Sequence, residues 1–403
     1  MSAWRPRSRS PEPSGRSHCP PRSAETGSGV RLAALDGVRI VAALSVLCYH
    51  YLALESAWGQ SAAAVFPVAS KCAAYGWLGV ELFFTVSGFV ICMSAWGRTV
   101  GEFAVSRISR LFPAYWVAVA FTATVLFAWP EVRGVKAFSD VVVNLSMLQG
   151  GMKVPNIDDA YWTLFVELKF YVLFALVILR GVTYRNCVVF CGVWTLAGIV
   201  APTADNGLLS FFAIPSFSPY FIAGIAFYLM RRFGPNPVLW TIAGLQFLLA
   251  QSYVQSRTIS NLGRTAAFEL PAWPAHTIIT CGFLVMAGIA LGAFDRVQWR
   301  WLPHAGAVTY PLYLIHMMAG LTLIHHFRHA LAPVPLVLGV TGVMTLLAWL
   351  IHRLVERPLG RLLRTGLRRG VEDIRRGTPR RAALPAIPAQ PPAPETERIP
   401  AAR

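Results

Sequence analysis

Charged residues are scarce in this sequence. Only 14% of its 403 residues are Asp, Glu, Lys or Arg, whereas soluble globular proteins carry roughly 25%. Hydrophobic residues make up 55% of the chain, and its mean hydropathy is +0.51. This composition excludes an ordinary soluble domain and indicates an integral membrane protein.

Acidic residues are scarcer than basic ones, so the chain carries a formal net charge of +17. Nucleic-acid-binding proteins show the same imbalance, but here the arginines concentrate in the two tails and in short stretches between apolar runs. No basic and aromatic single-strand platform and no helix-turn-helix context accompany them. We therefore expect no nucleic-acid partner, and we interpret the basic charge as a signal of membrane topology.

Paired cysteines are also missing. The seven cysteines are odd in number, none forms a CxxC pair, and most lie inside apolar runs. Neither a disulfide framework nor a zinc site is indicated, and we expect no metal and no bound cofactor. Cys187 and Cys191 lie four residues apart and are interpreted as small apolar packing residues.

The chain has instead ten apolar runs, each long enough to cross a hydrocarbon core of about 30 Å. They cover approximately residues 35–54, 73–94, 111–129, 161–179, 187–203, 208–230, 237–253, 275–293, 306–325 and 333–352. The sequence thus predicts an all-α, polytopic membrane bundle of about ten transmembrane helices. Most arginines between the runs fall in alternate connections, which places both termini in the cytoplasm. Arg257 and Arg264 are exceptions to this pattern.

Two tails flank this region. Residues 1–31 are rich in Arg, Ser and Pro and contain no apolar segment typical of a cleavable signal peptide. Residues 363–403 begin with a basic stretch and end in a Pro/Ala-rich one. We expect both to be disordered, basic cytoplasmic tails around a single membrane domain at 32–362, located in the cell membrane and surrounded by the lipid bilayer.

Polar side chains interrupt the first apolar run. Asp36 and Arg39 are three residues apart near its start and can pair. Arg39 and His50 are eleven residues apart, which is three helical turns plus about 20°, so they share one face about 16 Å apart. A charged residue in a membrane helix costs about 2.5 to 3.5 kcal/mol and usually faces a bundle interior.

Three further polar residues lie in other runs. Glu81 lies in the second run, Glu167 in the fourth and His316 in the ninth. Each alone is compatible with a structural hydrogen bond inside the membrane. Together with the first run they predict a polar chamber within the bundle.

Six segments resemble a known family when they are taken in order. They read LDGVRIVAALSVLCYH, GVELFFTVSGFVI, RISRLFPAYW, YWTLFVELKFY, YPLYLIH and VERPLGR. Over about residues 32–362 the sequence resembles the integral-membrane acyltransferase 3 family. The resemblance implies transfer of an acyl group, usually acetyl, from acyl-CoA to a hydroxyl of a carbohydrate or a macrolide-type acceptor.

The resemblance also assigns residues. The family's Arg-x10-His motif matches Arg39 and His50 with its spacing intact, and its RxxR loop matches Arg107 and Arg110. The SGF segment begins at Ser87, and the fourth-run pattern matches Trp162 and Glu167. Leu168 and Lys169 stand where many members have a second Glu and a Gln, which questions a role for paired carboxylates.

The chemistry of these side chains fits acyl transfer. A hydroxyl nucleophile needs a base of near-neutral pKa, which makes His50 the candidate base. Glu167 is expected to orient or stabilise its imidazole, as a carboxylate does in acyl-transfer triads. His316 is a weaker alternative base. Supporting roles are expected for Asp36, Glu81, Ser87, Trp162 and His316.

The donor would be held by arginines. Guanidinium groups bind phosphate with paired hydrogen bonds, so Arg107 and Arg110, with Arg39 above them, are candidates to hold acyl-CoA at a cytoplasmic loop. The alternative for the pair is a topological signal beside anionic lipid headgroups.

Other functions stay open at this point. A secondary transporter or flippase is the main alternative, although no internal repeat of the kind found in many transporters is evident. A sensory or scaffold protein without the family chemistry is a further one. The sequence leaves open the acceptor, the length of the donor's acyl chain, the oligomeric state and the leaflet of transfer.

Overall fold

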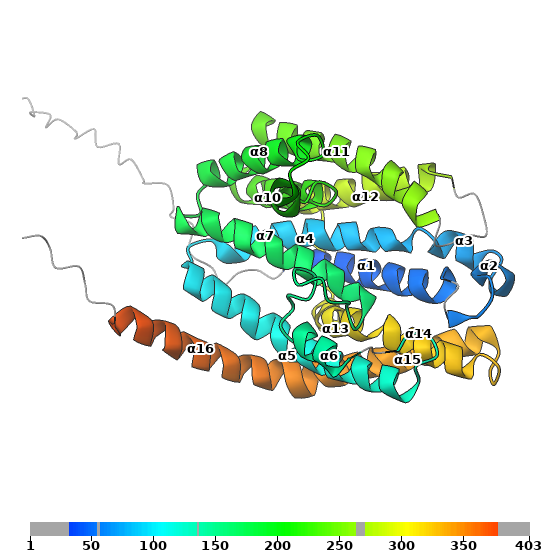
Figure 1. Ribbon diagram of the computed structural model, residues 1–403. Coiled ribbons are helices and arrows are strands. Elements are labelled where there is room, and N and C mark those ends of the chain that lie inside the picture. The colour runs from blue at the N-terminus through cyan, green and yellow to red at the C-terminus, as the bar shows by residue number, and fades with distance from the viewer. Residues whose placement is uncertain (1–31, 55–56, 135–136, 263–270, 378–403) are drawn as a thin grey trace, which may run out of the picture.

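The computed structural model describes residues 32–54, 57–134, 137–262 and 271–377, apart from the side chains of 259–262 and 374–376. Within these ranges the regular structure is helical and contains no strand, which confirms the all-α prediction (Figure 1). The elements are α1 (Ala33–Leu52), α2 (Ala62–Val65), α3 (Ala69–Ala73), η2 (Gly76–Leu78), α4 (Gly79–Ala95), α5 (Val100–Ala128), α6 (Phe138–Asn144), η3 (Asp159–Tyr161), α7 (Trp162–Leu179), α8 (Tyr184–Val200), α9 (Gly207–Ala213), α10 (Ser218–Phe233), α11 (Pro237–Leu262), α12 (Trp273–Ala290), α13 (Leu302–Ile315), α14 (Met318–Phe327), α15 (Pro333–Ile351), η4 (His352–Glu356) and α16 (Arg357–Gly377).

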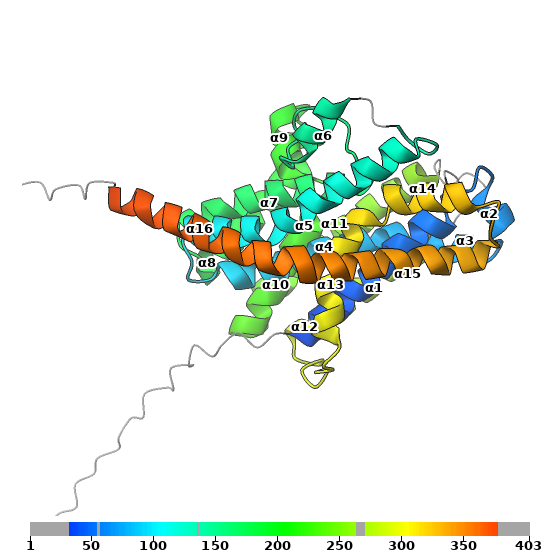
Figure 2. The same cartoon turned by 90° about the horizontal axis from the view of Figure 1, so that it is seen from below.

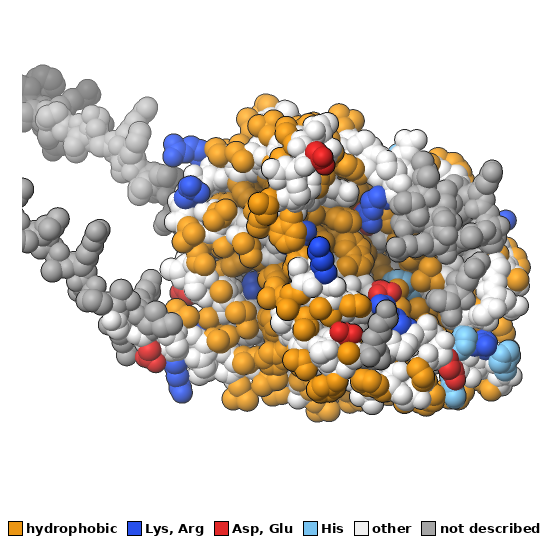
Figure 3. Space-filling view, in the orientation of Figure 1, with side chains coloured by type: hydrophobic (Ala, Val, Ile, Leu, Met, Phe, Trp, Pro, Cys, Tyr) orange, Lys and Arg blue, Asp and Glu red, His pale blue; other side chains and the backbone are white. Residues whose placement is uncertain are grey.

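In the part of the chain that the structure describes, fewer helices qualify as full membrane spans than the ten predicted runs. In the described part of the chain, eight helical segments are long and apolar enough to cross a membrane. α13 and α14 form one further, broken span with a bend of 69°, and α8 is apolar but shorter. Hydrophobic side chains cover most of the face seen in Figure 3, and Leu44, Val193 and Leu346 are about half exposed or more. The chain is therefore a multi-pass membrane protein, and the cytoplasmic placement of its termini stays a prediction.

α5 begins well before the predicted third run. The Oγ1 of Thr99 accepts a hydrogen bond from the N–H of Glu102 at 3.3 Å, and the carboxylate of Glu102 accepts one from the N–H of Thr99 at 2.9 Å. This capping box starts the helix at Val100. Arg107 and Arg110 consequently lie on a helix, and the prediction that they belong to a loop was wrong.

Glycines bring α4 and α10 into close contact. A Cβ on Gly88 would lie 2.1 Å from the carbonyl oxygen of Phe221, and a Cβ on Gly224 would lie 2.1 Å from that of Thr85. Small residues of this kind let two membrane helices approach backbone to backbone. The SGF segment thus has a packing role at Gly88, while the neighbouring Ser87 lines a cavity.

α16 continues α15 through the π-helical turn η4 and projects beyond the bundle (Figures 1 and 2). It packs on the first half of α5, where a Cβ on Gly360 would lie 2.8 Å from the carbonyl oxygen of Ser109. Residues 363–377 are therefore helical, which corrects the predicted start of a disordered tail at 363. The rest of the two predicted tails, 1–31 and 378–403, lies outside the described residues.

Candidate functional site

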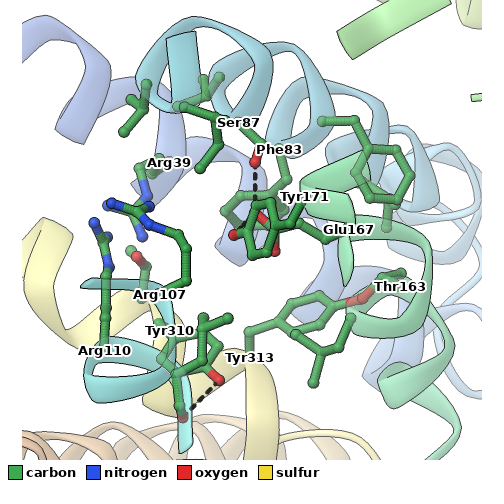
Figure 4. Close-up of a pocket in the computed structure, with 18 residues that line it drawn as sticks. Arg39, Phe83, Ser87, Arg107, Arg110, Thr163, Glu167, Tyr171, Tyr310 and Tyr313 are labelled. Carbon is green, nitrogen blue, oxygen red and sulfur yellow. Dashed lines mark hydrogen bonds between the residues drawn. The ribbon is translucent and has the colours of Figure 1, made fainter. Parts of the chain in front are cut away.

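Three predicted arginines line one small cavity inside the bundle, which we call the arginine cavity. It measures about 110 Å³ and lies between α1, α4, α5, α7 and α13. Arg39, Arg107 and Arg110 gather at one end, while Thr163 and Tyr313 lie at the other (Figure 4). Most of the remaining wall is apolar, with Val80, Phe83, Phe84, Val86, Val90, Ile91, Leu111 and Leu164.

The arginines of this cavity differ in their partners. Arg39 lies 3.9 Å from the carboxylate of Asp36, so the predicted pairing is present. Arg107 donates through Nη2 to the hydroxyls of Ser94 and Ser106 at 3.3 and 3.4 Å. Its Nε is buried and has no hydrogen-bond partner among the residues that the structure describes. A buried guanidinium N–H without a partner is costly, and a bound anion would satisfy it.

Glu167 lies on α7 in the wall of the same cavity. Its Oε1 accepts hydrogen bonds from the hydroxyl of Ser87 and, at 2.6 Å, from that of Tyr171 (Figure 4). The contact with Ser87 ties α7 to α4, and the one with Tyr171 lies within α7. They hold the carboxylate near the arginines and away from His50, which lines a different cavity.

The second cavity, which we call the histidine cavity, is larger, at about 650 Å³. His50 lines it together with Trp162, which was predicted as a supporting residue. The wall also carries two paired cations. Arg257 forms an ion pair with the buried Glu81, and Arg133 forms one with Asp159.

His50 pairs with His316. The Nδ1 of His50 lies 2.9 Å from the Nε2 of His316, and the Nδ1 of His316 lies 2.8 Å from the carbonyl oxygen of Tyr313. A carbonyl only accepts, so the neutral His316 carries its proton on Nδ1 and accepts at Nε2. His50 must then donate through Nδ1, which leaves the lone pair of its Nε2 free to act as a base.

This pairing corrects one expectation. Glu167 was predicted to orient the imidazole of His50, yet the side chain within hydrogen-bond distance of this ring is that of His316. His50 and His316 are 266 residues apart in the chain and meet because α13 breaks after Ile315. His316 thus lies within hydrogen-bond distance of His50, and whether either ring is the base stays a prediction.

The two cavities share a wall. Val80 and Tyr313 line both of them. The Tyr313 hydroxyl lies 2.9 Å from the Oγ1 of Thr163, and its ring packs edge-on against Phe83 with centroids 5.6 Å apart. A group held in the arginine cavity would therefore have this tyrosine between it and His50.

Three residues near these cavities were missed by sequence reasoning. Tyr313 carries no charge and gives no signal within an apolar run. Arg257 did give one, since it was an exception to the topology; its guanidinium stacks on Trp77 and Phe217 at 4.8 and 4.5 Å from the ring centroids. Asp158 precedes the fourth run and is fully buried. Among the described residues, no group of three or more His, Cys, Asp or Glu side chains could hold a metal ion.

Comparison with known proteins gives a consistent picture. Residues 32–353 match a family model described as an acyltransferase domain, Acyl_transf_3. An acyltransferase of Streptomyces mycarofaciens, MdmB, is 26% identical over 381 residues, which are 85% of this chain and 94% of the relative. The O-acetyltransferase OatA of Staphylococcus aureus is 28% identical over 167 residues, 36% of this chain and 24% of its own length. The exopolysaccharide production protein ExoZ of Rhizobium meliloti is 25% identical over 261 residues, 54% of this chain and 80% of the relative. No solved structure matches the chain.

Proposed function

Because the chain belongs to the acyltransferase 3 family and is a membrane acyltransferase, we propose that it moves an acyl group from acyl-CoA to a hydroxyl on the other side of the cell membrane. The donor binds in the arginine cavity from the cytoplasm. The acceptor, a carbohydrate or a macrolide-type molecule, binds in the histidine cavity. The observation that carries this proposal is the shared wall of Val80 and Tyr313 between a cationic cavity and a cavity with a base.

The arginine cavity suits the donor. Coenzyme A carries several phosphate charges, and Arg107 has a buried Nε without a hydrogen-bond partner among the described residues. The apolar part of the cavity, which ends at Tyr313 away from the arginines, would receive the uncharged pantetheine arm and a short acyl group. Phosphate binding at one end and thioester placement at the other follow from this distribution of charge.

The histidine cavity suits a neutral, hydroxylated acceptor. Its volume lies within the range of about 300 to 1,000 Å³ that is usual for small-molecule sites. Its aromatic side chains, Tyr49, Trp77 and Trp162, offer surfaces for a ring to lie on. Arg133 and Arg257 are each paired with a carboxylate, so these cations do not favour a negatively charged acceptor over a neutral one.

The reaction needs one base. The acceptor's hydroxyl oxygen attacks the thioester carbon while His50 Nε2 takes the hydroxyl proton, which forms the C–O ester bond. The C–S bond then breaks, and His50 returns the proton to the sulfur of CoA, so that ester and free thiol are the products. His316 accepts from Nδ1 of His50 throughout and stabilises the imidazolium that forms in between.

The test compares purified wild type with His50→Gln in lipid nanodiscs. [14C]acetyl-CoA is the donor, and glycan and metabolite extracts of the host are the acceptors. Gln keeps polarity and similar bulk but cannot take the proton, so we expect a loss of about 10²- to 10⁴-fold. His304→Gln, on an exposed histidine of α13, is the matched control and should behave as wild type. Near-normal transfer by His50→Gln would end this mechanism.

A further inference from the structure

The histidine pair depends on a break in a membrane helix. α13 ends at Ile315, α14 begins at Met318, and the two axes are bent by 69°. His316 lies at this break, so the position of its ring is set by whatever fixes the start of α14. Two side chains from other elements do so.

The first is Tyr51, the neighbour of His50 on α1. Its hydroxyl donates to the carbonyl oxygen of His316 at 2.8 Å, and its ring fits where a Cβ on Gly320 would otherwise lie. This contact holds the backbone of the break against α1.

The second is Asp158, which is fully buried and precedes η3. Its Oδ2 accepts from the backbone N–H of Met318, the first residue of α14, at 2.8 Å. Its Oδ1 accepts from the N–H of Ala160 at 2.9 Å. One carboxylate thus accepts hydrogen bonds from backbone N–H groups at the starts of two helices, which have no acceptor within their own helix. A negative charge at these positions is also favoured by the helix dipole.

We propose that Asp158 is a positioning residue for the reaction: by capping α14 at Met318 it holds His316 against His50 and so fixes which nitrogen of His50 is the free base. The inference rests on the proposed function of His50. Without this cap, α14 would start with an unsatisfied buried N–H, and the break would relax. His50 would then lose the hydrogen bond to His316 that keeps its proton on Nδ1.

The surroundings keep this carboxyl only partly charged. Burial raises the pKa of Asp158 to about 7, while the two backbone N–H groups oppose that shift. The titratable and charged groups that face it are Asp159 and Arg133, Tyr51 of α1, Tyr115 of α5, Tyr161 of η3 and Tyr313 of α13. None of them neutralises it as a close ion pair, so the backbone N–H groups are its main support.

Two substitutions separate the roles of Asp158. Asp158→Ser keeps a good cap for the start of η3 but is too short to reach Met318. Asp158→Asn keeps the size and leaves one acceptor oxygen for two donors. The matched control is Asp205→Asn, an exposed aspartate whose φ of 43° asparagine tolerates well.

The experiment measures acyl transfer from [14C]acetyl-CoA in the full-length protein in nanodiscs. We expect both Asp158 variants to lower kcat about 10- to 100-fold, with the KM for acetyl-CoA within about twofold, since the donor cavity is untouched. In a His316→Leu background, adding Asp158→Ser should lower kcat by less than about twofold further, because the cap then has no histidine to position. Full additivity with His316→Leu, or wild-type kcat in Asp158→Ser, would overturn the proposal.

A spectroscopic measurement keeps the test decisive if the variants are poorly active for other reasons. In 15N-histidine-labelled wild type, His50, assigned by its loss in His50→Gln, should be protonated on Nδ1 and unprotonated on Nε2. Asp158→Ser should mix the two tautomers of His50, and Asp205→Asn should not. An unchanged tautomer in Asp158→Ser refutes the positioning role. A wild type with the expected tautomer but no acyl transfer refutes the proposed function instead.

Discussion

Replacing His316 by leucine removes the hydrogen-bonding partner of His50. The His316 side chain is 1% exposed, and leucine brings no polar group of its own into this site. Two hydrogen bonds are lost: one at 2.8 Å to the carbonyl oxygen of Tyr313, and one at 2.9 Å to His50, whose ring becomes charged during the reaction. Hydrogen bonds to charged groups contribute about 1.5 to 3 kcal/mol.

This energy converts to a rate. At about 1.4 kcal/mol per factor of ten, His316→Leu should lower kcat by roughly 10- to 100-fold. The loss is smaller than for His50→Gln, because the base remains and only its orientation and charge stabilisation are reduced. The KM for acetyl-CoA should stay within about twofold, since His316 does not line the arginine cavity.

The assay is the rate of CoA release and of labelled product in nanodiscs, with purified wild type, His316→Leu and His304→Leu compared at one protein concentration. His304 is exposed and distant from the pair, so its variant controls for the loss of a histidine as such. Two results would refute the reasoning. One is wild-type kcat in His316→Leu; the other is a loss as complete as that of His50→Gln, which would make His316 the base.

Three other predictions test separate parts of the account. Arg107→Ala should raise the KM for acetyl-CoA about 10- to 100-fold and change kcat less, because phosphate contacts mainly supply uniform binding; an unchanged KM would leave the arginines as a topological signal. Gly88→Ala should lower the melting temperature in detergent, since its Cβ would lie 2.1 Å from the carbonyl oxygen of Phe221, whereas Gly192→Ala, with open space, should not. Burial raises the pKa of Asp158 from 3.8 to about 7, so the native state holds a proton that the unfolded chain releases, and wild-type stability should fall as pH rises from 4 to 7. The stability of Asp158→Asn should fall less over that pH range. A stability curve parallel to that of wild type would contradict the raised pKa of Asp158.

The helices could be predicted from the sequence because burial in lipid leaves a direct signal. Runs of about 20 apolar residues are needed to cross the membrane, and each of the ten runs is helical in the structure. The start of α5 was also readable, since Thr99 and Glu102 form a capping box, but the apolar pattern alone placed it too late. α16 was missed because its residues are mostly polar and arginine-rich, and it is supported by packing on α5 rather than by lipid.

The site was predictable residue by residue but not as a set of contacts. Arg39, Arg107 and Arg110 do converge, because α1 and the first half of α5 both line one cavity. The partner of His50 could not be inferred, since contacts between distant helices leave no periodic trace in a single sequence. His316 reaches His50 only because of the break in its span, and Asp158 reaches that break from a loop 160 residues away.

In the proposed reaction, donor and acceptor meet from opposite sides of the membrane. The most direct measurement uses wild-type protein reconstituted in one orientation in sealed vesicles, with [14C]acetyl-CoA on the side of the C-terminus. Host glycan and metabolite extracts are supplied as acceptors either inside or outside. We expect labelled ester on acceptors placed opposite the donor, and its loss in His50→Gln. Label only on acceptors that share the donor's side would contradict it.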